Sequence, residues 1–226
     1  MADFFAARKR ARQARAQETE EVILEAANRL VQRDGDTGFS TNRIAEVAGV
    51  SVGSLYQYFP GKDAILHALV KREFNRTVDG HVRHIESLDT SRLSLEEAVA
   101  SIVDHVFDSQ SRSRPLYRRL ALSVLSIRHL SFTLDNDARV LEAVRRKLSA
   151  YGEATLDGLD SALFVTLYTL KGVQIGMVLS GRPNDDRALR AALTRSVLAA
   201  IAPGRLRSTE NKSGTDSGRR ATPETS

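Results

Sequence analysis

The spacing of apolar residues predicts helices along most of the chain. Between residues 22 and 31, apolar side chains recur at steps of three and four, and the same spacing returns over residues 65–85 and 95–107. Four further segments have a helical apolar pattern: residues 115–127, 141–151, 162–179 and 186–201. Strand-like alternation never lasts for more than a few residues. The sequence therefore predicts an all-α protein of about nine helices.

Residues 40–62 contain two short helical patterns separated by a glycine: S-T-N-R-I-A-E-V-A-G-V-S-V-G-S-L-Y-Q-Y-F-P-G-K. Gly49 can adopt the left-handed conformation that lets one helix end and another begin at a steep angle. Ser51 is expected to cap the second helix, because its hydroxyl can accept a free backbone amide. Pro60 prevents that helix from continuing through Phe59. This is the helix-turn-helix arrangement, whose second helix enters the major groove of DNA.

The same stretch resembles the DNA-binding signature of the TetR family of bacterial transcriptional repressors. The resemblance covers roughly residues 19–69 and depends on the order of many matching positions. These are Thr41, Ile44, Ala45, Ala48, Gly49, Val50, Ser51, Gly53, Leu55, Tyr56, Tyr58, Phe59, Lys62 and Leu66. Val52 departs from the pattern, because many relatives carry lysine or arginine there. The resemblance implies a homodimeric transcriptional regulator, a repressor released from a palindromic operator by a small-molecule effector.

The residues expected to contact DNA fall into two groups. The residues expected to face the major groove are Ser51, Val52, Gly53, Ser54 and Gln57. Gln57 can bind adenine through both atoms of its carboxamide, and Val52 can touch a thymine methyl group. The residues that resemble the family's phosphate contacts are Thr41, Asn42, Arg43, Tyr56 and Lys62. Tyr58 is included in the predicted interface, although it can equally belong to the core.

The sequence predicts four segments: a basic flexible arm (1–18), a helix-turn-helix domain (19–66), an all-helical effector-binding and dimerisation domain (67–202) and a disordered tail (203–226). Thr19 is expected to cap the first helix. The cations of the arm are Arg8, Lys9, Arg10, Arg12 and Arg15. Just upstream of a helix-turn-helix, they can reach phosphates or the adjacent minor groove. The alternative is a solvated tail without a role.

Two sets of residues carry the predictions for the larger domain. Small residues at every fourth position of the most apolar helix, with apolar residues of the last helix, predict a four-helix bundle between two copies, although packing within one chain is the alternative. This predicted dimer interface consists of Gly172, Gly176, Ser180, Leu189, Leu193 and Val197. Candidate walls of an apolar effector pocket, which could equally fill the core, are Phe107, Tyr117, Leu120, Leu125, Phe164 and Tyr168.

Composition narrows the classes of protein that remain. The 226 residues are 42% hydrophobic and 27% charged, with a net charge of +5 and no cysteine. Disulfides and thiolate metal sites are therefore excluded. We see no secretory signal and no uninterrupted apolar stretch of the roughly 18 residues that a membrane span needs, so we expect a cytoplasmic protein with no membrane partner.

Three rival functions have some support in the sequence. Residues 49–53 spell G-x-S-x-G, the motif of serine hydrolases, but a helical pattern and not a strand precedes Ser51. His81 and His84 lie one helical turn apart and could bind a metal with Asp79, yet a solvated pair is the commoner situation. We therefore expect no enzyme, no cofactor and no metal. An architectural DNA-binding protein without an effector is the remaining alternative, and an internal cavity would favour the ligand-gated regulator.

Overall fold

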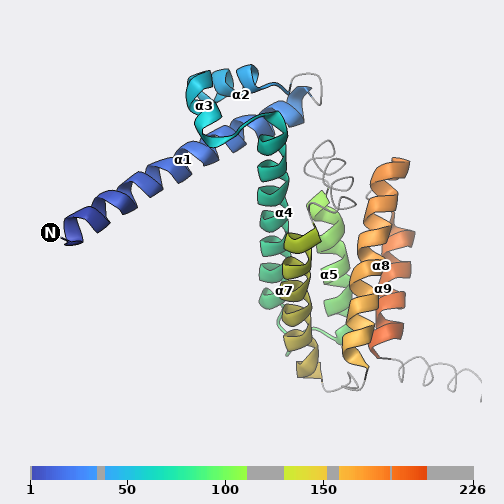
Figure 1. The fold of residues 1–226 in the computed structure, drawn as a ribbon. Helices are drawn as coiled ribbons and strands as arrows, with labels where there is room; N and C mark the ends of the chain where they lie inside the picture. Colours follow the sequence, from blue (N-terminus) through green and yellow to red (C-terminus); the bar gives the residue numbers. More distant parts are fainter. Residues whose placement is uncertain (1, 35–38, 111–129, 152–157, 184, 203–226) are drawn as a thin grey trace, which may run out of the picture. The chain divides into compact units, whose positions relative to one another are not determined.

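The computed structural model describes residues 2–34, 39–110, 130–151, 158–183 and 185–202, and these residues form helices with no strand among them (Figure 1). In chain order the α-helices are α1 (Ala2–Asp34), α2 (Thr41–Ala48), α3 (Val52–Tyr58), α4 (Lys62–Ser87), α5 (Leu95–Gln110), α7 (Leu130–Leu148), α8 (Leu159–Ser180) and α9 (Arg187–Ile201). A short 3-10 helix, η2 (Ser149–Tyr151), follows α7. The all-α prediction is confirmed. The helix predicted to start at Pro115 and the tail predicted over residues 203–226 lie outside the described residues.

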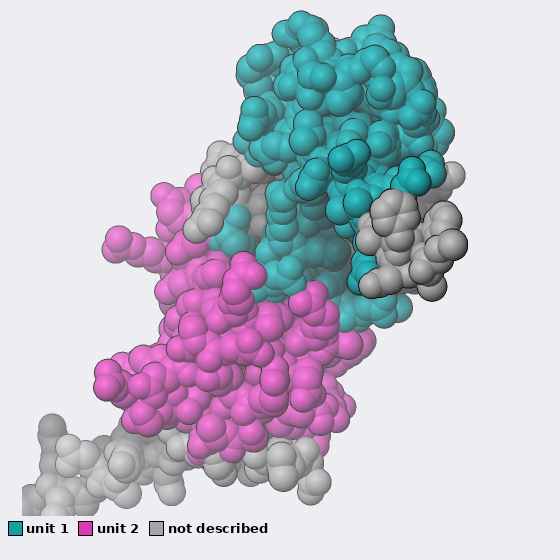
Figure 2. Space-filling model, turned by 90° about the vertical axis from the view of Figure 1, so that its left-hand side faces the viewer, with its two compact units in different colours: residues 1–80, 109–136, 178–182 teal, residues 81–108, 137–177, 183–226 magenta. Residues whose placement is uncertain are grey.

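The chain divides into two compact units (Figure 2). Unit 1 comprises residues 1–80, 109–136 and 178–182, and unit 2 comprises residues 81–108, 137–177 and 183–226. The first boundary lies inside α4, after Gly80, whereas the sequence placed it after residue 66. One continuous helix therefore belongs partly to each unit.

Helix α1 begins much earlier than predicted, at Ala2 instead of Thr19. The hydroxyl of Thr19 does not cap a helix but donates a 2.9 Å hydrogen bond to the carbonyl of Arg15 one turn earlier. Residues 2–18 are helical in the structure, whereas the sequence predicted a flexible arm. The physical reason is composition, because alanine, arginine, glutamine and lysine have high helix propensities and dominate residues 6–17.

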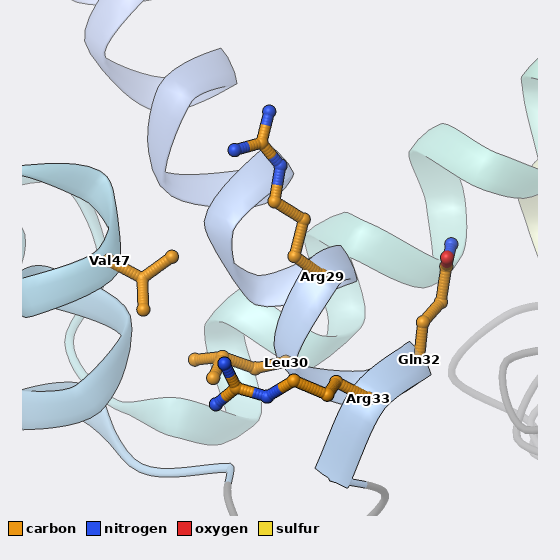
Figure 3. A pocket seen from close by; sticks show the side chains of 5 residues that line it. All are labelled: Arg29, Leu30, Gln32, Arg33 and Val47. Carbon is orange, nitrogen blue, oxygen red and sulfur yellow. The ribbon is translucent and has the colours of Figure 1, made fainter.

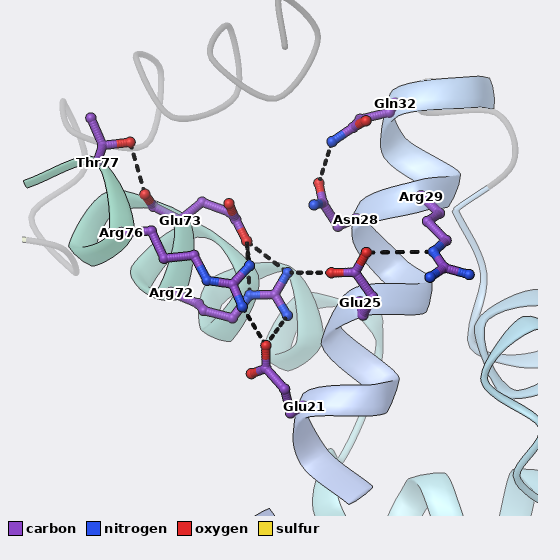
Figure 4. Close-up of polar contacts among 9 residues, drawn as sticks. All are labelled: Glu21, Glu25, Asn28, Arg29, Gln32, Arg72, Glu73, Arg76 and Thr77. Carbon is purple, nitrogen blue, oxygen red and sulfur yellow. Dashed lines mark hydrogen bonds and ion pairs between the residues drawn. The ribbon is translucent and has the colours of Figure 1, made fainter. Parts of the chain in front are cut away.

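The core of unit 1 forms where apolar faces of four helices meet. The most deeply buried contributions are Ile23, Ala27 and Val31 from α1, Ile44 from α2, Leu55 from α3, and Ile65 and Leu69 from α4. Phe39, which precedes α2, fills this core and is 8% exposed. Carboxylates of α1 also face guanidinium groups of α4, so that the two helices are joined by ion pairs as well as by apolar contacts (Figure 4).

The core of unit 2 is built from α5, the end of α7, α8 and α9. Its buried apolar side chains include Leu95, Val99, Val103, Phe107, Leu148, Leu163, Met177, Leu193 and Ile201. Helix α9 begins after Asp186, whose carboxylate accepts a 2.9 Å hydrogen bond from the amide of Leu189. That cap accounts for the predicted start of the last helix at this position.

Candidate nucleic-acid interface

The turn between α2 and α3 has the predicted glycine geometry. Gly49 lies in the left-handed region with φ 68° and ψ 27°, directly after the last residue of α2. The amide of Gly49 donates to the carbonyl of Glu46 (3.2 Å), and the amide of Val50 donates to that of Ala45 (3.0 Å). These bonds satisfy the free carbonyls at the end of α2 and turn the chain sharply into α3.

Ser51 is the N-cap of α3, as predicted. Its hydroxyl accepts a 3.0 Å hydrogen bond from the amide of Ser54 and also lies 2.8 Å from the Ser54 hydroxyl. Helix α3 ends at Tyr58, and Phe59 is extended immediately before Pro60. Since α2 precedes Ser51, the strand that a nucleophile elbow requires is not there.

Helix α3 presents one face to the core of unit 1 and the other to solvent. Leu55 is fully buried, whereas Val52 is 39% and Tyr56 50% exposed. Gly53 and Gln57 are exposed as well. Tyr58 differs from Tyr56, because it is half-buried and packs against the core. The outward face therefore contains Val52, Tyr56 and Gln57, with Gly53 between them.

The predicted phosphate contacts gather at the starts of helices. Thr41 and Asn42 are the first residues of α2, and Lys62 is the first residue of α4. Helix N-termini favour anions through their free amides and the helix dipole. The hydroxyls of Thr41 and Tyr56 lie 3.4 Å apart, so that the start of α2 is connected to α3.

Arg43, on the exposed side of α2, forms a 2.7 Å ion pair with Glu46. A phosphate at this position must therefore compete with a carboxylate for the guanidinium group. The cations that the sequence assigned to an arm, Arg8, Lys9, Arg10, Arg12 and Arg15, are all exposed along the N-terminal half of α1.

The predicted effector-pocket residues are not alike in their surroundings. Phe107 is buried in the core of unit 2, with the guanidinium carbon of Arg190 5.2 Å from its ring centre. Phe164 and Tyr168 are 55% and 38% exposed on α8, with their rings 4.6 Å apart. Tyr117, Leu120 and Leu125 lie outside the described residues. The effector pocket thus stays a prediction, in which Phe164 and Tyr168 are surface residues.

A recess of about 540 Å³ is present in unit 1, between α1 and α2 (Figure 3). Arg29, Leu30, Gln32 and Arg33 of α1 line it together with Val47 of α2. It contains none of the residues predicted for the effector pocket. It therefore gives no support to an effector site at those positions.

The predicted dimer residues of α8 and α9 face in different directions. Gly172, Gly176 and Ser180 are exposed, and a Cβ atom added at either glycine would meet nothing within 4 Å. Leu193 is only 5% exposed and belongs to the core of unit 2. Its own chain already buries this side chain, which leaves little of it for a dimer interface. Leu189 and Val197 are half-buried against the same core.

One exposed face of α9 was not part of the dimer interface predicted from the sequence. It contains Ala188, Ala191 and Arg195, which helical spacing places on one side of α9. The available signal was the recurrence of alanine at helical spacing, which the larger leucines of the opposite face obscured. A partner helix can approach closely only where side chains are small, so these alanines, and not Leu193, suit an interface.

The histidines of α4 pack in the structure instead of being solvated. The ring of His84 stacks on that of His105 at 4.1 Å, and His81 meets His105 edge-on at 5.3 Å. Burial, followed by the neighbouring His105 and His84, lowers the pKa of His81 to about 4. Among the described residues, no three histidine or carboxylate groups are arranged to hold a metal ion.

Helix α8 is long and apolar enough, by length and composition alone, to cross a membrane, with a mean hydropathy of 1.5. Its polar side chains nevertheless have partners in unit 2. The hydroxyl of Tyr168 donates a 3.0 Å hydrogen bond to the buried carboxylate of Asp137 on α7, and Lys171 forms an ion pair with the same group. Such contacts to a buried carboxylate are typical of a helix packed within a folded domain.

The two helices joined at Gly49, with α3 facing outward, form a helix-turn-helix, the motif whose second helix enters the major groove in DNA-binding proteins. The family model described as bacterial regulatory proteins, tetR family, matches residues 23–69. Residues 23–69 therefore form a DNA-binding domain of the TetR family type.

Similar proteins agree with this assignment. The nucleoid occlusion factor SlmA of Actinobacillus pleuropneumoniae is 32% identical over 85 residues, which are 38% of this chain and 40% of that protein. The HTH-type transcriptional regulator SACOL2593 of Staphylococcus aureus is 25% identical over 141 residues, 62% of each chain. The matches thus span less than two thirds of these relatives.

Solved structures share the fold. A TetR-family transcriptional regulator from Mesorhizobium loti has a TM-score of 0.61 at 18% identity, covering 82% of this chain and 94% of that one. SmeT, the repressor of the Stenotrophomonas maltophilia multidrug efflux pump SmeDEF, has a TM-score of 0.58 at 22% identity, covering 82% and 91%.

Proposed function

We propose that this protein is a cytoplasmic homodimeric repressor that binds a palindromic operator and leaves it when a small molecule binds the larger helical part of the chain. The observation that supports it most directly is the outward face of α3. Val52 and Gln57 are exposed there, on a helix that Leu55 anchors in the core.

In this proposal, two side chains of α3 contact the bases. Gln57 offers a donor and an acceptor that match the major-groove edge of adenine, and Val52 offers a methyl surface for thymine. Lys62, Thr41 and Tyr56 hold phosphates, which set the register of α3 without reading bases. Specificity therefore rests on Gln57 and Val52, and affinity rests largely on cations.

The exposed surface of α8 supports a dimer. Phe164, Val165 and Leu179 are 51–58% exposed on this helix, beside the open Gly172 and Gly176. Large exposed apolar residues around small ones suit a close helix crossing with a second copy, completed by the alanines of α9. Two copies related by a two-fold axis can place two α3 helices about 34 Å apart, the spacing of half-sites one DNA turn apart.

The effector part of the proposal rests on α4. This helix runs without interruption from Lys62 to Ser87, so a ligand that repacks its C-terminal part can tilt the end that carries Lys62. SmeT, which shares the fold, is named as a repressor of an efflux pump. The rival is an architectural DNA-binding protein without an effector. The two are distinguished by whether any compound releases the protein from its DNA.

The proposal is tested by selecting bound genomic fragments with the purified full chain and by measuring its mass in solution. We expect fragments with an inverted repeat and the mass of a dimer. Gly176→Arg should give a monomer, since a Cβ atom added at this position meets nothing within 4 Å in its own chain, whereas the long side chain blocks a close crossing. Glu96→Arg, an exposed change on α5, is the control and should stay dimeric. A monomeric wild type, or fragments without an inverted repeat, would contradict the dimeric repressor.

A further inference from the structure

The N-terminal half of α1 is a basic helix that projects past α2 and α3 (Figure 1). Every side chain from residue 8 to residue 15 is exposed. The segment contains five cations, Arg8, Lys9, Arg10, Arg12 and Arg15, against two acids, Asp3 and Glu18. Residues 8–15 thus add charge to unit 1 but no buried apolar side chain.

Helical geometry places three of the arginines on one side. At about 100° per residue, Arg8, Arg12 and Arg15 fall within roughly 60° of one another, whereas Arg10 lies on the opposite side. We call these three residues the arginine stripe. Because each residue advances the helix by about 1.5 Å, the stripe is about 10 Å long.

The segment is poorly suited to remain helical by itself in water. Like charges three and four residues apart repel, and cations near a helix N-terminus oppose the helix dipole. A single helix of this length is also only marginally stable without packing. An anionic surface along the arginine stripe removes the repulsion, and thereby favours the helix.

We propose that residues 2–18 form a helical extension that lies along the phosphate backbone beside the site read by α3, with Arg8, Arg12 and Arg15 on phosphates. This inference rests on the proposed function and adds a second DNA-contacting surface to it. Binding to DNA then stabilises the helix of this segment.

The dimensions determine which part of the duplex the extension can reach. An α-helix with its side chains is about 10–12 Å wide, whereas the minor groove is about 6 Å wide. The extension therefore stays outside the minor groove that a flexible arm could enter. With a length of about 25 Å, it can cover up to about seven base pairs at 3.4 Å each. Its contacts are with phosphates, so they add affinity to every sequence alike.

The test compares two charge-matched double variants of the full chain on a random-sequence duplex, between about 50 and 200 mM salt. Arg12→Ala/Arg15→Ala removes two members of the arginine stripe, and Lys9→Ala/Arg10→Ala removes two charges outside it. The first should reduce the slope of log affinity against log salt by about 1.8 for each extension bound. The second should reduce the slope by less than half as much. Equal reductions would overturn the arginine stripe.

A third variant, Ala11→Pro, keeps every charge but interrupts the helix. Ala11 is exposed and outside the core of unit 1, so the rest of the chain should fold as before. We expect the wild type to protect up to about seven base pairs more than this variant at the edge of the footprint. We also expect circular dichroism to show a gain of helix when wild type meets the random duplex. Identical footprints would overturn the inference, and so would a gain of helix only with vesicles of anionic phospholipid.

Failure of the extension is distinguishable from failure of the proposed function. If the wild type binds a selected genomic fragment tightly and all three variants retain its salt slope and footprint, the extension alone is refuted. If the wild type selects no fragment over random DNA, the proposed function is refuted as well.

Discussion

Arg72 of α4 donates a 3.0 Å hydrogen bond from Nη1 to Oε1 of Glu21 on α1 (Figure 4). Arg72 also lies 2.6 Å from Glu73 and 3.6 Å from Glu25, and its side chain is only 10% exposed. Arg76 reaches the same oxygen of Glu21 but is 51% exposed. The charged contact between the first helix and α4 is therefore centred on Arg72.

Arg72→Ala should lower the free energy of unfolding by about 1.5–3 kcal/mol, because it removes hydrogen bonds between charged groups and leaves three carboxylates close together. Arg76→Ala is the matched control and should cost less than about 1 kcal/mol, since its ion pairs are exposed to solvent. Urea unfolding followed by circular dichroism measures both. Equal losses would show that burial of Arg72 does not strengthen these contacts.

Gly49→Ala should destabilise the chain by about 1–2 kcal/mol through backbone strain alone. The added Cβ would meet no atom within 4 Å, so crowding does not contribute, whereas φ at 68° is unfavourable for alanine. Gly49→Asn should cost less, because asparagine tolerates this region better. Thermal unfolding of the two variants tests the order. A more stable alanine variant would contradict the assigned turn.

His81 should make the protein less stable below about pH 6.5. Its pKa is 6.5 when unfolded and about 4 in the structure, so the unfolded chain binds a proton first as the pH falls. The contribution of neutral His81 to the free energy of unfolding is fully present above about pH 6.5 and decreases as the pH falls to about 4. The loss should reach about 2 kcal/mol at pH 5. Urea unfolding of wild type and of His81→Leu, at pH 7 and at pH 5, tests this. The variant should lose less free energy of unfolding between the two pH values than the wild type. The same loss in both proteins would show that the pKa of His81 is not lowered.

The parts of the interface that depend on neighbouring residues could be predicted from the sequence. Gly49 determines the turn through its own backbone conformation, and Ser51 caps α3 through a hydrogen bond to an amide three residues later. Both effects follow from residue type. The end of α3 before Pro60 follows in the same way. These local rules place Val52 and Gln57 on the outward side of α3 from residue type and helical spacing alone.

Features that depend on distant packing could not be predicted as well. Helix α8 has apolar residues on all of its faces. Its sequence therefore does not show that Phe164 faces solvent while Leu163 is buried. Leu193 has the same character in a core or in a dimer interface. Thr19 looks like a helix cap, yet the strong helix formers upstream extend α1 to Ala2. His81 could not be recognised as packed against another ring without the position of His105 on α5.

The central claim is that α3 reads sequence while the start of α4 holds phosphate. It is tested most directly by the affinities of Gln57→Ala and Lys62→Ala for a selected genomic fragment and for a random duplex. Lys62→Ala should weaken binding to both alike and lower the salt slope by about one for each site. Gln57→Ala should reduce discrimination by about 1–3 kcal/mol for each adenine read, with random binding unchanged. Unchanged binding of both duplexes by both variants would contradict the account.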